Sequence, residues 1–108
     1  MNRGDIWLVE LRGKIGKRPV IILARRKVLQ YLNKVTVAEV TTKGKGYPTE
    51  VFLGQKANLP KSSFVQTDNI HTVAKERLAK YMGTVDATTM MEVSRKVILA
   101  LGLEGCLE

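Results

Sequence analysis

Cysteine, histidine and aromatic residues are all scarce in this chain of 108 residues. The one cysteine, Cys106, allows neither an intrachain disulfide nor a cysteine-based metal site. The one histidine, His71, excludes the scheme in which two histidines act as acid and base on RNA. The ten Asp and Glu residues lie singly along the chain, without the spacing to one another or to histidine that metal ligands need. The sequence therefore predicts neither a metal nor a cofactor.

Long apolar runs are absent as well. No window approaches the roughly 18 consecutive apolar residues of a membrane-spanning helix. The apolar run near the N-terminus is too short for a secretory signal, so we expect a cytoplasmic protein without a membrane partner. Two enzyme motifs are also missing. No serine stands in a nucleophile elbow, and Gly-Lys-Gly at 44–46 lacks the spacing of a phosphate-binding P-loop.

Positive charge is the strongest signal in the composition, and the formal net charge is +8. Residues 1–45 hold eleven Lys and Arg against three acidic residues, whereas residues 46–108 hold seven of each sign. A localised cationic field suits the phosphate backbone of a nucleic acid or an acidic protein partner. The alternative is a basic surface without any partner.

The pattern of apolar residues predicts one β-rich domain over residues 1–108. Strands are expected at 5–11, 18–26, 34–42, 49–53, 63–73 and 81–85. The stretch at 63–73 is expected to kink near Asp68 and Asn69. The continuously apolar middle of 18–26 predicts a strand buried on both faces, and the Gly and Pro residues of 43–48 predict a turn.

The hydrophobic period changes to that of a helix between Asp86 and Leu103. Either Asp86 or Thr89 can cap its start, and Gly102 can end it. The stripe expected to face the core consists of Met90, Val93, Val97, Ala100 and Leu101. We therefore predict a small barrel of strands closed by one C-terminal helix.

One catalytic chemistry remains open to these side chains. RNA carries its own nucleophile, the 2′-OH, so a protein can cleave it by orienting that oxygen and stabilising the charge of the phosphorane. Arg18 enters the second strand just before Pro19, and its guanidinium can bind phosphate oxygens while Lys17 adds positive field. Thr41 and Thr42 end the third strand and can bring hydroxyls to the same phosphate. The alternative is that Arg18 is only a solvated charge at a strand entry.

Four segments, in this order along the chain, resemble the MazF/PemK family of toxin endoribonucleases from toxin/antitoxin pairs. They are "RGDIWLVEL", "KRPVIIL", "VTVAEVTTKGKGYPTEV" and "SFVQTDNIHTVAKERL", and the resemblance runs from Arg3 to about Leu103. It implies an SH3-like small barrel of the MazF/PemK/CcdB kind, mainly β, with a strongly twisted antiparallel sheet and a C-terminal α-helix. It also implies a homodimer that cuts single-stranded RNA at a short sequence without a metal. Attack by the 2′-OH would leave a 2′,3′-cyclic phosphate and a 5′-OH.

The resemblance also implies roles for single residues. The family's catalytic arginine, in its Arg-Pro motif, falls on Arg18, and its catalytic threonine falls on Thr41. Thr42 and Ser63 match nearby positions of the site. The residues expected to border the RNA groove are Lys43, Lys45 and Tyr47. The family further implies a MazE-like antitoxin whose acidic C-terminal segment occupies this groove, which agrees with the basic N-terminal half.

The chain departs from the family pattern at three places. The first loop, "RGKIGK" at 12–17, is shorter than usual and lacks the usual glutamate. Asn69 replaces the common Gln of an Asp-Gln-Ile segment, and His71 replaces a frequent basic residue. We expect the loop length and Asn69 to change which bases are read. Neither departure removes Arg18 or Thr41.

Two other functions stay open at this point. The CcdB toxins, which share the barrel, bind DNA gyrase and cleave nothing, whereas a non-catalytic RNA-binding barrel would bind RNA in a salt-sensitive way without products. Arg18 and Thr41 together favour the nuclease. His71 is expected to be structural or exposed rather than catalytic, and Trp7 to lie in the core or at a dimer interface.

Overall fold

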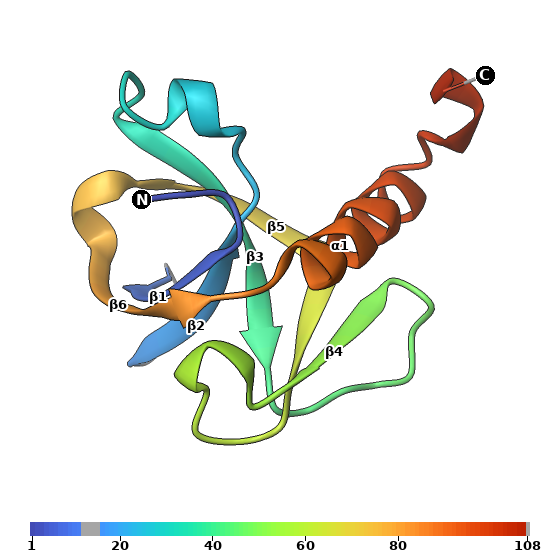
Figure 1. Ribbon diagram of the computed structural model, residues 1–108, viewed down its shortest axis with the longest axis horizontal. Helices are drawn as coiled ribbons and strands as arrows, with labels where there is room; N and C mark the ends of the chain where they lie inside the picture. The colour runs from blue at the N-terminus through green and yellow to red at the C-terminus, as the bar shows by residue number, and fades with distance from the viewer. Residues whose placement is uncertain (12–15, 108) are drawn as a thin grey trace.

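The computed structural model describes residues 1–11 and 16–107. Over these residues the chain forms one antiparallel sheet of six strands in the order β4-β5-β3-β2-β1-β6, followed by a single α-helix, α1 (Figure 1). The strands are β1 (Asp5–Glu10), β2 (Lys17–Ile22), β3 (Lys34–Thr41), β4 (Glu50–Gly54), β5 (Ser63–Ala74) and β6 (Leu78–Thr84), and α1 is Ala87–Ala100. Short 3₁₀ turns lie at Arg26–Val28, Lys56–Asn58, Lys75–Arg77 and Glu104–Leu107. This confirms the predicted class, a mainly β protein with one C-terminal helix.

The sheet buries apolar side chains on both faces. Val20, Ile21 and Ile22 in β2 are fully buried, which confirms the prediction for this strand. Ile21 belongs to the core that α1 covers through Val93, while Val20 and Ile22 belong to a second core on the opposite face. Since a fully buried side chain of this size stabilises the fold by roughly 2 kcal/mol, the two cores make β2 and β3 the rigid centre of the molecule.

The predicted kink in β5 is a change of register. Pairing between β3 and β5 shifts between Ala38 and Glu39, so that Ala38 pairs with Ile70 but Glu39 pairs with Gln66. Thr67, inside this irregularity, is fully buried and its hydroxyl donates to the Thr49 carbonyl at 2.6 Å. The irregularity therefore ties β5 to the start of β4 and turns Asp68 and Asn69 outward.

The helix begins where one of the two predicted caps places it. The Asp86 carboxylate accepts the Thr89 N–H at 3.1 Å, and hydrogen bonds from Thr89 hold the pKa of Asp86 below its ordinary value. The expectation that Leu101 faces the core is wrong, because this side chain is 56% exposed. The helix ends at Ala100 and Gly102 adopts φ +67°, so the chain turns away before Leu101 reaches the sheet. Among the described residues, no helix has the length and apolar character needed to cross a membrane.

Candidate functional site

Four side chains form a line across the open end of the sheet. Val20 in β2 pairs with Glu39 in β3, and continuing this antiparallel register by two residues places Arg18 opposite Thr41. Thr41 in turn pairs with Phe64 in β5, which pairs with Phe52 in β4. Directly paired residues point to the same face of a sheet, so all four share one face. We call Arg18, Thr41, Phe64 and Phe52 the first row.

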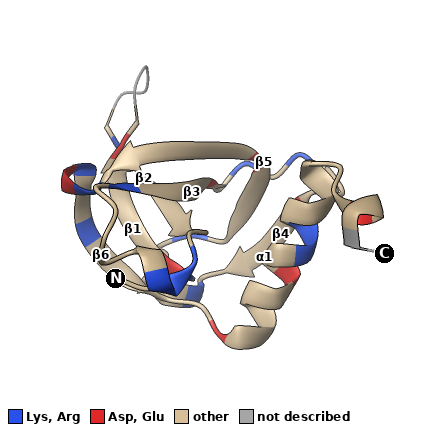
Figure 2. Cartoon of the chain, turned by 90° about the horizontal axis from the view of Figure 1, so that it is seen from above, with Lys and Arg blue, Asp and Glu red and all other residues tan. Residues whose placement is uncertain are grey.

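Arg18 is available to a ligand. Arg18 pairs with Val9 of β1 on one side. On its other side it has no paired residue in the described part of the chain, because the ladder between β2 and β3 begins only at Val20. The residue is exposed, and its guanidinium forms no ion pair or hydrogen bond with the other residues that the structure describes. Because a guanidinium carries a permanent charge and a fork of N–H donors, Arg18 offers a ready site for phosphate oxygens. Lys17 beside it is also exposed, at the start of β2 where Figure 2 shows basic residues.

Thr41 is oriented by the chain that follows it. Its Oγ1 accepts the Lys43 N–H at 3.1 Å, a local turn that leaves the hydroxyl hydrogen free to donate. Thr41 is half-buried, whereas Thr42 and Lys43 are exposed. The fold thus presents one fixed hydroxyl donor across from one uncommitted guanidinium.

The segment 42–49 runs in an extended arc from the end of β3 to the start of β4 (Figure 1), and Glu50 holds it in place. The Glu50 carboxylate accepts the Lys45 N–H at 3.0 and 3.1 Å and the Gly46 N–H at 2.9 Å. Partial desolvation raises the pKa of Glu50, but these hydrogen bonds and one from Gln66 lower it more, so the pKa lies below its ordinary value. This anchoring fixes the backbone of residues 45–46 at the start of β4, and the side chains of Lys45 and Tyr47 are exposed.

A second, polar row lies two residues further along the same strands. We call Glu39, Gln66 and Glu50 the second row, because Glu39 pairs with Gln66, which pairs with Glu50. The amide of Asn69 donates to Gln66 Oε1 at 3.0 Å, which brings the predicted specificity residue to this row. His71 Nε2 lies 2.6 Å from Glu39 Oε2. No sequence pattern indicates this carboxylate partner of His71, because the β5 irregularity sets which residues meet.

Ser63 does not reach this face. It is 2% exposed, pairs with Gly54, and its hydroxyl donates to the Lys61 carbonyl at 2.8 Å. The match to a site position in the sequence therefore falls on a serine whose hydroxyl is used inside the turn. By contrast, Phe52 and Phe64 lie in the first row although sequence reasoning missed both. Their one signal was an apolar residue at the outward position of the strand at 49–53.

The prediction about the first loop concerns residues 12–17, of which 12–15 lie outside the described residues. Among the described residues, no three His, Cys, Asp or Glu side chains come together as a group that could hold a metal ion.

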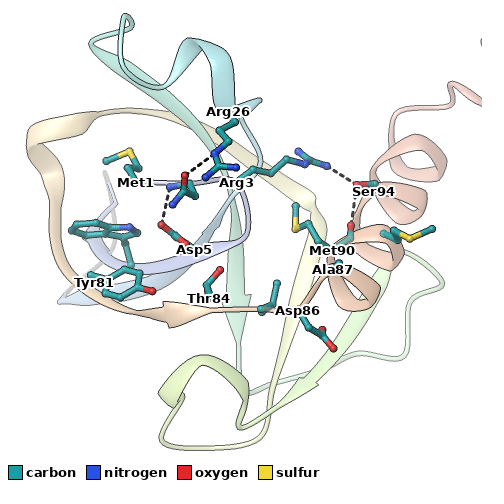
Figure 3. Close-up of a pocket in the computed structure, with 14 residues that line it drawn as sticks. Met1, Arg3, Asp5, Arg26, Tyr81, Thr84, Asp86, Ala87, Met90 and Ser94 are labelled. Carbon is teal, nitrogen blue, oxygen red and sulfur yellow. Dashed lines mark hydrogen bonds between the residues drawn. The ribbon is translucent and has the colours of Figure 1, made fainter.

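A cavity of about 790 Å³ lies away from the first row, between β1, β6 and the start of α1 (Figure 3). Its wall includes Trp7 and Tyr81, whose rings meet edge to face at 5.6 Å, and Met90 and Met91 of α1. Figure 3 shows Arg3 reaching across to Ser94, which closes one side. The buried Trp7 Nε1 has no hydrogen-bond partner among the described residues. An apolar wall with one unsatisfied donor is typical of a surface that a second protein surface completes.

Comparison with known proteins gives one consistent result. Residues 2–101 match the model of a family described as PemK-like, MazF-like toxin of type II toxin-antitoxin system. The chain is 30% identical to Endoribonuclease MazF4 of Mycobacterium tuberculosis over 101 residues, covering 94% of this chain and 92% of that protein. It is 31% identical to Endoribonuclease MazF of Staphylococcus epidermidis over 114 residues, covering 97% and 94%.

The solved structures similar to this chain include an endoribonuclease and a MazF toxin, in agreement with these relatives. The Mycobacterium tuberculosis toxin MazF-mt6 superposes with a TM-score of 0.85 at 31% identity, covering 93% of this chain and 98% of that one. A mycobacterial endoribonuclease in complex with its cognate antitoxin also gives a TM-score of 0.85, at 29% identity and with 95% and 96% covered. The six-stranded sheet and C-terminal helix described above are therefore the arrangement of these proteins.

Proposed function

Because the chain belongs to the family of PemK-like, MazF-like toxins of type II toxin-antitoxin systems, we propose that it is an endoribonuclease toxin whose catalytic pair is Arg18 and Thr41. It cuts single-stranded RNA at a short sequence, without a metal, and leaves a 2′,3′-cyclic phosphate and a 5′-OH. The relatives named above are endoribonucleases, which favours cleavage over gyrase binding and over RNA binding without cleavage.

The observation that supports this proposal is the register of β2 and β3, which places Arg18 opposite Thr41 when it is continued two residues beyond the pair Val20 and Glu39. The Arg18 guanidinium binds two oxygens of the scissile phosphate, and the Thr41 hydroxyl donates to the phosphate and fixes its orientation. The 2′ oxygen then attacks phosphorus, and the bond from phosphorus to the 5′ oxygen breaks. Because Arg18 is already charged, it stabilises the added negative charge of the phosphorane without any rearrangement.

The balance of this reaction requires no further reactant. The 2′-OH loses a proton as it attacks, and the departing 5′ oxygen gains one. Water takes no part in the bond changes, which is why a cyclic phosphate is the product. Among the described residues, Glu39 and Glu50 of the second row are carboxylates on the same face as Arg18.

The RNA chain around the scissile phosphate lies along the exposed residues near the two rows. Lys17, Lys43 and Lys45 supply positive field, and all three are exposed. Other groups that can contact bases or sugars are Thr42, Tyr47 and Asn69, since single strands are read by stacking and by contacts to base edges. Ser63 acts indirectly, by fixing the turn before β5.

Two protein partners follow from the same proposal. The first is a MazE-like antitoxin whose acidic C-terminal segment covers the cationic site. A similar endoribonuclease has been solved in complex with its cognate antitoxin, which supports an antitoxin as the partner. The second is another copy of this chain, because the wall around Trp7, Tyr81 and Met91 is apolar and partly exposed. We expect the protein to act in the cytoplasm, where its RNA substrate is found.

A cleavage experiment tests the proposal directly. A long single-stranded RNA of mixed sequence is incubated in excess EDTA with the wild type or with Arg18→Ala, and the product ends are mapped. We expect discrete cuts with cyclic phosphate ends from the wild type, and a loss of about 10³-fold in rate for Arg18→Ala. Equal cleavage by both proteins would refute the role of Arg18, and intact RNA with both would refute the nuclease.

A further inference from the structure

We propose that Phe52, supported by Phe64, forms a stacking platform for a nucleobase of the RNA beside the scissile phosphate. This inference rests on the proposed endoribonuclease function and assigns a base-binding subsite to the same face. It concerns a part of the first row that neither composition nor motif indicated.

The exposure of Phe52 is the first argument. Phe52 is 62% exposed in the middle of β4, between Val51 and Leu53, which are both buried. The alternation of the strand places residue 52 on the open face, where a polar side chain would serve folding equally well. A large aromatic ring that the described residues leave uncovered is typical of a binding surface.

The rigidity of the platform is the second argument. Phe52 and Phe64 meet edge to face, with ring centroids 5.3 Å apart and an interplanar angle of 60°. Gly44 lies so close to Phe64 that a Cβ at this glycine would fall 2.8 Å from the ring, so only glycine lets the 42–49 segment cover Phe64. The Phe52 ring thus packs on one side against Phe64, which the 42–49 segment covers, and this contact orients the ring before any ligand binds.

Position along the row is the third argument, and it identifies the ligand. Neighbouring strands lie about 4.8 Å apart, so the Cα of Phe52 lies roughly 10 Å from that of Thr41, with Phe64 between them. A nucleotide joined to a phosphate at Thr41 can place its base at this distance. Because Lys43 and Lys45 are exposed on the adjoining segment, the platform favours a polyanion with flat apolar bases, which is single-stranded RNA.

The test combines protein variants with RNAs that lack one base. The substrate is a short single-stranded RNA spanning one mapped cut, together with a series in which each position beside the cut is made abasic in turn. The proteins are wild type, Phe52→Leu, Phe52→Trp and the control Tyr31→Leu, an aromatic residue that is 77% exposed before β3 and outside both rows. Cleavage is measured as kcat/KM, and binding is measured separately on RNA with a 2′-deoxy nucleotide at the cut.

We expect Phe52→Leu to lose about 10-fold in binding and in kcat/KM on intact RNA, equal to about 1.4 kcal/mol and within the range for stacking of one base. At one abasic position the wild type shows the same loss and Phe52→Leu shows no further loss, because both changes remove the same contact. Phe52→Trp keeps a flat ring that can stack and should lose less than Phe52→Leu, and the control Tyr31→Leu stays within about twofold of the wild type. Since Phe52 is exposed, neither substitution at this position threatens folding, and matched thermal denaturation curves verify this.

Two results overturn the inference while leaving the nuclease intact. One is a Phe52→Leu variant that cleaves and binds RNA like the wild type, which would indicate that the exposed ring contacts a protein partner and not a base. The other is a Phe52→Leu variant whose kcat/KM stays about 10-fold below that of the wild type at every abasic position, which would mean a general effect on the site. Failure of the nuclease itself gives a different result, because the wild type would then bind the RNA series without cutting any member.

Discussion

Replacing Glu50 by glutamine should loosen the segment that orients Thr41. The Glu50 carboxylate accepts the N–H groups of Lys45 and Gly46 with both oxygens, and these bonds hold residues 42–49 in place. Hydrogen bonds to a charged group contribute about 1.5–3 kcal/mol each, but solvent competes at this exposed site. Glutamine keeps one acceptor oxygen and loses the charge. We therefore expect Glu50→Gln to lower the free energy of unfolding by about 1 kcal/mol, equivalent to about 5 °C in melting temperature.

The pH dependence of this difference has a definite sign. Hydrogen bonds lower the pKa of Glu50 in the folded state more than desolvation raises it, so its stabilising contribution is present above the unfolded pKa of about 4.3. The contribution is lost as pH falls through the folded pKa. The difference in stability between wild type and Glu50→Gln should therefore be constant between about pH 5 and pH 7 and shrink below about pH 4.

Urea denaturation at a series of pH values measures this difference. The matched control is Glu104→Gln, which changes an exposed carboxylate in the last 3₁₀ turn and should leave the free energy of unfolding at pH 7 unchanged. Single-turnover cleavage should also slow for Glu50→Gln, because the Lys43 N–H that orients Thr41 belongs to the loosened segment. A difference in stability that persists unchanged at pH 3.5 would show that the carboxylate charge does not hold the segment, and would refute this reasoning.

Three further predictions test other parts of the structure. Arg18→Lys should lower kcat about 100-fold with little change in KM, because lysine keeps the charge but lacks the planar fork, and an equally active variant would contradict the bidentate role. Asp86→Ala should lower the midpoint of thermal denaturation through loss of the helix cap, while leaving RNA cleavage unchanged. Met91→Glu should convert the proposed homodimer to a monomer in light-scattering measurements, whereas the control Leu32→Glu should remain dimeric. A dimeric Met91→Glu would place the interface elsewhere.

The local pattern of the sequence was sufficient for most of the fold. Alternating β-branched residues predicted β3, and the continuous apolar run predicted that β2 is buried on both faces. The Gly and Pro residues of 43–48 predicted the turn between β3 and β4. The ends of elements were less accurate, because β6 begins at Leu78 and not near residue 81, and β2 ends at Ile22. These ends depend on which strand lies alongside, and a single stretch of sequence does not contain that information.

Some residues of the site could be predicted from the local sequence, and others only from the pairing of the strands. Arg18 and Thr41 could be proposed because each stands at a strand end with a neighbouring marker, a proline for one and a second threonine for the other. Ser63 was assigned from a motif, yet its hydroxyl is buried in a turn. Phe52 and Phe64 could not be found, because they become neighbours only through the β4–β5 pairing. The contact of His71 with Glu39 depends in addition on the irregular register of β5.

The location of the site follows from how the two cores fill the sheet. Moving along β2 toward its start, the side chains on one face change from buried Ile22 and Val20 to exposed Arg18. Along β3 the same face changes from buried Val37 through Glu39, which His71 contacts, to half-buried Thr41. Both strands are thus anchored by apolar packing only a few residues from the polar pair, so the backbone beneath Arg18 and Thr41 is rigid although their side chains reach solvent. A catalytic pair that acts by position and charge needs this combination, because a displaced phosphate would lose the contacts that stabilise its transition state.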